Sequence, residues 1–157
     1  MPLPKVGTKA PAFAVPDETG KVRRLSEFAG KWVLLYFYPK DDTPGCTIEA
    51  CTIRDQFKDF KKIGAVVLGA SKDSVESHRR FKDAYELPFT LLSDTDLTLN
   101  KAYGVWGKKK MAGREYMGTK RMSFLIDPKG KVAKVYETVK PPVHAAEVIA
   151  DLNALSK

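Results

Sequence analysis

Apolar residues along the chain occur both as continuous runs and as helically spaced stripes. A continuous run predicts a strand that is covered on both faces, and a stripe predicts a helix with one buried side. The runs fall at residues 32–38 (WVLLYFY), 65–71 (AVVLGAS) and 89–94 (FTLLSD). Helices are predicted between and after them, at residues 44–63, 74–85, 97–103 and 144–155. Gly64 supplies the C-terminal stop of the first of these helices.

Turn residues predict two hairpins, one near each end of the chain. Residues 13–15 and 22–25 flank the turn DETG, and residues 123–127 and 131–139 flank Pro-Lys-Gly. Strands that alternate with helices and then close on a hairpin predict an α/β fold, with a central mixed sheet and helices on both faces. This order matches a thioredoxin-like architecture, and the length predicts one domain over residues 1–157.

Charge adds a question about partners, because the formal net charge is +8. The densest cluster is Lys108–Lys110, interpreted as an exposed basic loop, with Lys120 and Arg121 nearby. The other cations are interspersed with acids, and no nucleic-acid-binding motif is present. A solvated basic surface is therefore favoured over nucleic-acid binding.

No apolar run approaches the length that a membrane span requires, and the N-terminal residues lack the apolar stretch of a signal peptide. We therefore expect a cytoplasmic protein that does not associate with membranes. Since a cytosolic disulfide is more often catalytic or transient than structural, the two cysteines of the chain are candidates for a catalytic role.

Cys46 lies at the start of the helix predicted from Pro44, with Thr43 at the N-cap position. Unpaired N–H groups and the helix dipole favour a thiolate there, which makes Cys46 a candidate nucleophile. A second interpretation stays open: Cys46 heads an apolar stripe that continues through Ala50 and Ile53, and a free cysteine is commonly a small buried hydrophobe.

Cys51 lies off this stripe, five residues after Cys46. In an intact helix their Cα atoms are ~8.5 Å apart, whereas a disulfide needs about 4.4–6.8 Å. A bond between the two sulfurs therefore requires the first turns of the helix to unwind. We expect the reduced form to be helical here and the oxidised form not to be.

Other thiol chemistries have weaker support in the sequence. Two cysteines and the widely separated His78 and His144 lack the spacing of a structural zinc site. The two histidines are interpreted as exposed helix residues, and neither has a cue that places it as the base of a cysteine protease. The CxxC motif of dithiol exchange is absent. We expect neither a metal nor a bound cofactor.

The string Pro39-x-x-x-Thr43-x-x-Cys46 resembles the active-site motif of the peroxiredoxins, which are thiol peroxidases on a thioredoxin fold. The longer string YFYPKDDTPGCTIEAC, together with FTLLSD, GVWG and RMSFLID, resembles the bacterioferritin comigratory protein (PrxQ) branch. The resemblance covers nearly the whole chain.

The resemblance implies roles for five residues. Cys46 would be the peroxidatic cysteine that hydrogen peroxide or an organic hydroperoxide oxidises to sulfenic acid. Thr43 would bind the peroxide, Pro39 would shield the site, and Arg121 would lie beside the thiolate and lower its pKa. Cys51 would be the resolving cysteine, and thioredoxin or a similar dithiol protein would reduce the disulfide.

Three points stay open at this level. Glu49, in the segment TIEA, is either a supporting hydrogen-bond partner or an exposed helix carboxylate. Resolution within one chain favours a monomer over a weak dimer. The alternative function is a redox-switched binding or holdase protein, which would use Lys108–Lys110 as a docking surface. Phe37 and Trp106 are interpreted as packing residues.

Overall fold

Residues 2–156 are described by the structure, which is a computed structural model. No helix in that range is long and apolar enough to cross a membrane. The elements follow in the order β1 (Ala14–Pro16), β2 (Val22–Arg24), the 3₁₀ helix η1 (Leu25–Phe28), β3 (Val33–Phe37), α1 (Pro44–Asp55), α2 (Phe57–Ile63), β4 (Val66–Ser71), α3 (Val75–Tyr85), β5 (Thr90–Ser93), α4 (Thr98–Ala102), β6 (Trp106–Met111), β7 (Arg114–Thr119), β8 (Met122–Ile126), β9 (Val132–Tyr136) and α5 (His144–Leu155).

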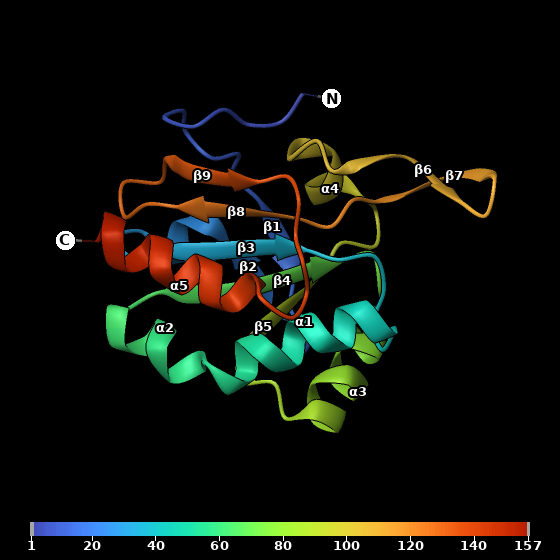
Figure 1. The fold of residues 1–157 in the computed structure, drawn as a ribbon, viewed down its shortest axis with the longest axis horizontal. Helices are drawn as coiled ribbons and strands as arrows, with labels where there is room; N and C mark the ends of the chain where they lie inside the picture. Colours follow the sequence, from blue (N-terminus) through green and yellow to red (C-terminus); the bar gives the residue numbers. More distant parts are fainter. Residues whose placement is uncertain (1, 157) are drawn as a thin grey trace.

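A mixed sheet in the order β5-β4-β3-β8-β9 lies at the centre of the molecule (Figure 1). β3 is parallel to β4, and β4 is parallel to β5, whereas β8 is antiparallel to both β3 and β9. All five residues of β3 are buried, because both faces of the sheet are covered there. The predicted central mixed sheet is confirmed.

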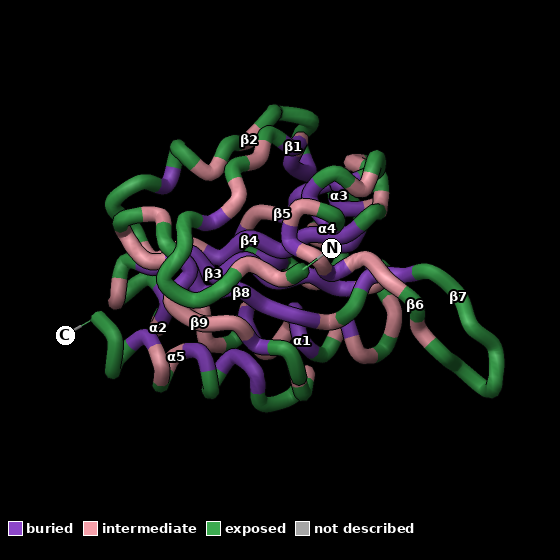
Figure 2. Tube along the Cα trace, turned by 90° about the horizontal axis from the view of Figure 1, so that it is seen from above, coloured by how far each residue is buried: buried purple, intermediate pink, exposed green. Residues whose placement is uncertain are grey.

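Each face of the sheet has its own hydrophobic core. One core contains inward-facing residues of α1, α2, α3 and α5, among them Ile53, Phe60 and Phe81. The core of the opposite face contains residues of β1, η1 and α4, among them Val15 and Leu99. Figure 2 shows α1, α2 and α5 on one side of the sheet and the β1–β2 hairpin on the other. Right-handed crossovers from β3 to β4 and from β4 to β5 place α1, α2 and α3 on the same face.

The helix predicted over residues 44–63 is two helices, α1 and α2, with a break at Gln56. The predicted apolar stripe is buried at Cys46, Ala50, Ile53 and Phe60. Gly64 ends α2 in the left-handed conformation (φ 84°), as its position predicted.

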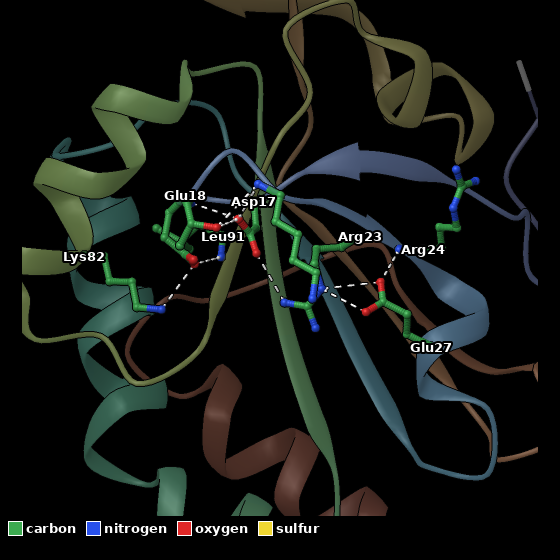
Figure 3. Close-up of polar contacts among 9 residues, drawn as sticks. Asp17, Glu18, Arg23, Arg24, Glu27, Lys82 and Leu91 are labelled. Atoms are coloured by element: carbon green, nitrogen blue, oxygen red, sulfur yellow. Dashed lines mark hydrogen bonds and ion pairs between the residues drawn. The ribbon is translucent and has the colours of Figure 1, made fainter.

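The predicted N-terminal hairpin is observed as β1 and β2, and polar contacts attach it to the edge of the sheet (Figure 3). Asp17 forms an ion pair with Arg23 across the hairpin (3.3 Å). The Glu18 carboxylate accepts hydrogen bonds from the backbone N–H of Leu91 on β5 (3.1 Å) and from Lys82 on α3 (3.2 Å). The hairpin is thereby attached to both β5 and α3.

The hairpin of β6 and β7 is absent from the sequence-based prediction. The interpretation of Lys108–Lys110 as a loop is wrong, since these lysines lie on β6 and pair with β7. The hairpin projects from the molecule (Figures 1 and 2), and most of its residues are exposed, so no alternation of apolar and polar positions marks it. Ala112 and Gly113 at its turn both have positive φ, and that glycine is its one clear sequence signal.

Both histidines are fully buried, so the expectation that they are exposed is wrong. The His78 ring hydrogen-bonds with the Asp41 carboxylate (2.7 Å) and the Leu92 carbonyl (2.9 Å). The His144 ring hydrogen-bonds with the Ser123 hydroxyl (2.8 Å). These partners lie 14 to 37 residues away in sequence, and a pattern read along one helix does not reveal them.

Candidate active site

The candidate site lies at the end of the sheet that is formed by the C-terminus of β3, the central strand. The loop of residues 38–43 leaves β3 there and leads into α1. The antiparallel register pairs Phe37, the last residue of β3, with Met122, the first residue of β8, so the chain enters β8 at the same end of the sheet. Arg121 directly precedes Met122. The pairing of β3 with β8 thus brings Arg121 close to Cys46, which is 75 residues away in sequence.

Thr43 occupies the N-cap position of α1 with an extended backbone, and Pro44 is the first helical residue. The Thr43 hydroxyl does not cap the helix but donates to the Lys40 carbonyl (2.9 Å). Its oxygen therefore retains lone pairs that can accept a hydrogen bond from a ligand. Pro39 is half-buried in the same loop, two residues beyond the end of β3.

Cys46 lies in the first turn of α1, and its residue is 1% exposed. Arg121 Nη2 donates to Cys46 Sγ at 3.2 Å. The Arg121 side chain is 20% exposed, so a small polar molecule that reaches the guanidinium from solvent comes next to the sulfur. A guanidinium and a helix N-terminus thus both direct positive potential at this sulfur.

Glu49, one turn after Cys46, is completely buried and is not the exposed carboxylate of one of the two interpretations. Its Oε1 accepts from Arg121 Nη1 at 2.6 Å, and its Oε2 has no hydrogen-bond partner. Arg121 thus binds Cys46 and Glu49 with its two terminal nitrogens. This fixes the guanidinium plane, since Arg presents its donors in a rigid fork.

Burial and charge act in opposite directions in this cluster. Burial raises the pKa of Glu49 to about 7, and the charge of Arg121 only partly offsets that rise. Burial acts to lower the pKa of Arg121, but Cys46 and Glu49 outweigh it and the pKa is raised. Lys109 on β6 adds a second positive charge to that of Arg121. Its pKa is lowered, mainly by burial and also by the charge of Arg121.

Gly45 allows Arg121 to approach the start of α1. A Cβ at this position would lie 3.1 Å from Arg121 Nη2, closer than most carbon contacts in proteins. The same Cβ would lie 3.9 Å from Pro141, in the segment that precedes α5. The Pro141 carbonyl in turn accepts from the Thr52 hydroxyl on α1 (3.2 Å). Gly45 and the segment around Pro141 therefore border the guanidinium, and the absence of a side chain at residue 45 leaves room for it.

The loop before α1 is anchored by a buried polar network that the sequence did not suggest. The Asp41 carboxylate accepts from the hydroxyls of Tyr38 (2.6 Å) and Ser77 (2.8 Å) and hydrogen-bonds with His78 (2.7 Å). The Asp41 N–H donates to Asp73 at 2.9 Å. Buried polar groups that satisfy one another in this way specify one conformation of the loop.

The same network contains the group within residues 2–156 that comes nearest to a metal-binding set. Ligand atoms of Asp41, Asp73 and His78 lie within 4.8 Å of one another. The Asp41 carboxylate and both His78 ring nitrogens are engaged in hydrogen bonds. We therefore interpret the group as a structural network.

Cys51 is half-buried in α1, and both cysteines are free thiols. The helix is continuous from Pro44 to Asp55, as expected for the reduced form. In the structure Arg121 therefore contacts both Cys46 and Glu49, and Thr43 lies at the N-cap before the sulfur. Cys51 stands apart, further along the same helix. A sulfur that faces a guanidinium and a helix N-terminus suits attack on an electrophile whose leaving oxygen gains charge.

The chain is similar to known proteins over most of its length. The AhpC/TSA family matches residues 6–135. The chain is 51% identical to a putative peroxiredoxin bcp of Coxiella burnetii over 148 residues, which cover 94% of this chain and 98% of that protein. The resemblance noted in the sequence is thereby confirmed.

Solved structures agree with the sequence comparison. A PrxQ mutant of Xylella fastidiosa superposes with a TM-score of 0.93 at 34% identity, over 100% of both chains. The bacterioferritin comigratory protein of Xanthomonas campestris, studied for its alkyl peroxide reduction activity, has a TM-score of 0.90 at 37% identity, covering 98% of this chain and 100% of that one. The predicted thioredoxin-like fold is confirmed by these neighbours.

Proposed function

This chain belongs to the AhpC/TSA family and is a thiol peroxidase of the peroxiredoxin type, and we propose that Cys46 is the thiol that attacks the peroxide. The observation that carries this assignment is the 3.2 Å contact between Cys46 Sγ and Arg121 Nη2 in the first turn of α1. It gives the sulfur two sources of positive potential, the guanidinium and the helix N-terminus.

In the first step the Cys46 thiolate attacks the terminal oxygen of hydrogen peroxide or an organic hydroperoxide. An S–O bond forms and the O–O bond breaks, so the cysteine becomes a sulfenic acid. The leaving oxygen departs as hydroxide or alkoxide and takes up a proton to become water or an alcohol. The Thr43 hydroxyl, whose own proton is donated to the Lys40 carbonyl, accepts a hydrogen bond from the peroxide O–H and so orients it. Arg121 stabilises the charge on the leaving oxygen. Pro39 limits access of other molecules to the sulfur.

In the second step Cys51 resolves the sulfenic acid. Its sulfur attacks Cys46, the S–S bond forms, and the S–OH oxygen leaves with the thiol proton as water. The intact helix keeps the two sulfurs too far apart for this reaction, so the first turns of α1 must unwind. A dithiol protein of the thioredoxin type then returns both cysteines to thiols by exchange, and no bound cofactor takes part.

The two-cysteine cycle also bears on the catalytic unit and on the compartment in which the enzyme works. Both steps use residues of one chain, so residues 1–157 serve as one catalytic domain that works as a monomer, without nucleic acid or membrane as a partner. The cycle needs a dithiol reductant that is kept reduced, a condition that the cytoplasm meets.

A thioredoxin-coupled assay that follows NADPH consumption tests the proposal, with hydrogen peroxide and an organic hydroperoxide as substrates. We expect turnover by the parent and none by Cys46→Ser. Cys51→Ser should retain the first oxidation, seen as rapid loss of one equivalent of peroxide, but should not turn over with thioredoxin. Equal activity of parent and Cys46→Ser would overturn the assignment.

The comparisons do not favour the alternative of a redox-switched binding or holdase protein. The same assay separates the two functions. A holdase would give slow turnover with thioredoxin and would capture another protein only after oxidation, whereas a peroxidase turns over without a bound client.

A further inference from the structure

The loop between β3 and α1 is attached to α3 at two consecutive aspartates, in two different ways. Asp41 is buried in the polar network, and its carboxylate hydrogen-bonds with Ser77 and His78 of α3. Asp42 is exposed, and its carboxylate accepts a single hydrogen bond, from the Tyr85 hydroxyl at 2.8 Å. The attachment at Asp41 is costly to break, because breaking it would leave charged and polar groups unpaired in the interior.

The second attachment holds a strained residue. Asp42 has φ +60°, in the left-handed region that non-glycine residues rarely adopt. Once its hydrogen bond is broken, the residue gains by returning to an extended conformation. The loop therefore has a fixed part that ends at Asp41 and a part that Tyr85 restrains from Asp42 onwards.

Tyr85 itself is well held and lies beside the region that changes. Arg54, in the last turn of α1, donates to the Tyr85 carbonyl at 2.7 Å. The Tyr85 ring packs edge-on against Phe81, with 5.4 Å between centroids. The hydrogen bond to Asp42 is also the main reason that the pKa of Tyr85 is raised.

We propose that Tyr85 is a positioning residue that holds Asp42, and with it the first turn of α1, in the conformation that reacts with peroxide, and that breaking its hydrogen bond is part of the unwinding that lets Cys51 reach Cys46. The proposal rests on the roles of the two cysteines given above. It assigns the hinge of the unwinding segment to the bond between Asp41 and Asp42.

The consequence concerns the competition for the sulfenic acid. Cys51 forms the disulfide with loss of water, whereas a second peroxide adds another oxygen and gives sulfinic acid. Resolution takes place from the unwound state, so its rate is proportional to the population of that state. Tyr85 thereby tunes both the rate of disulfide formation and the sensitivity of the enzyme to excess peroxide.

The variant Tyr85→Phe removes the hydroxyl and keeps the ring packing. One hydrogen bond of this kind is lost from the folded state only, so disulfide formation should accelerate roughly twofold to tenfold. The fraction of sulfinic acid formed per turnover should fall by the same factor. The rate of the first oxidation should not change measurably, because the helical conformation remains the major one in the variant and Cys46 and Arg121 are untouched.

The measurement is a rapid-quench experiment on the reduced full-length chain. Samples are mixed with hydrogen peroxide, quenched with a thiol-alkylating reagent and analysed by mass spectrometry for sulfenic acid, disulfide and sulfinic acid. Tyr116→Phe on the β6–β7 hairpin is the matched control, and it should behave like the parent at both steps. Thermal unfolding of each variant is recorded alongside.

Faster disulfide formation in Tyr85→Phe with an unchanged first step supports the proposal. An unchanged or slower disulfide step overturns it, as does equal slowing of both steps, which a merely structural role would produce. Failure of the proposed function has a separate signature: the parent itself would then form no disulfide between Cys46 and Cys51.

Discussion

Replacing Glu49 by Gln tests whether the interior of this site carries the charge balance inferred for it. Glu49 is completely buried, one of its oxygens contacts Arg121 at 2.6 Å and the other has no partner. Burial raises its pKa from 4.5 to about 7 despite the arginine. The isosteric Glu49→Gln removes the charge and retains an oxygen for Arg121.

The rise in pKa sets the size and the sign of the effect on stability. A carboxyl whose pKa is higher in the folded state contributes stability that is fully present below pH 4.5 and is lost as the pH rises through about 7. Between pH 5 and pH 8 this group alone should lower the free energy of unfolding by roughly 2–3 kcal/mol. The Gln variant has no such group, so its free energy of unfolding relative to that of the parent should rise over this range.

Urea unfolding of the reduced proteins at pH 5, 6, 7 and 8 measures the difference. Glu76→Gln is the matched control, because the Glu76 side chain is 77% exposed. Its difference from the parent should stay small and nearly constant with pH. If Glu49→Gln and the parent show parallel curves from pH 5 to pH 8, the inferred protonation of Glu49 is wrong.

Three further substitutions have defined outcomes. Gly45→Ala should shift the guanidinium and slow the oxidation of Cys46 in stopped flow roughly threefold to tenfold, without loss of stability; an unchanged rate would show that the close approach is unimportant. Arg121→Lys should slow that oxidation roughly 10²-fold to 10³-fold, and a fall of less than threefold would contradict its role. His78→Leu should cost about 1–3 kcal/mol in urea unfolding, because the Asp41 carboxylate and the Leu92 carbonyl each lose a buried hydrogen-bond partner; no measurable cost would refute the account of the network.

The sheet could be predicted because its strands are covered on both faces. Val33–Phe37 and Val66–Ser71 are unbroken apolar runs that end at recognisable stops. The β6–β7 hairpin could not be predicted, since its two strands pair only with each other and most of its surface faces solvent. The break at Gln56 was also missed, because the apolar stripe continues across it.

In the site, too, only the features that depend on local sequence could be predicted from the sequence alone. Thr43 and Cys46 are neighbours in sequence, so the start of a helix and its effect on a thiol could be derived from local pattern alone. Arg121 was identified through the family resemblance, because the strand register that brings it to Cys46 is not readable from one chain. Glu49 stayed undecided, and the link from Asp41 to His78 was missed, since both depend on how helices pack in three dimensions.

The central claim is that Cys46 is the oxidised thiol and that Cys51 resolves it. Peptide mapping after one equivalent of hydrogen peroxide addresses this most directly. We predict a peptide pair linked through Cys46 and Cys51 in the parent, and a single oxygen on Cys46, trapped as the sulfenic adduct, in Cys51→Ser. Oxidation of Cys51 ahead of Cys46, or peroxide loss at the parent rate in Cys46→Ser, would contradict the account.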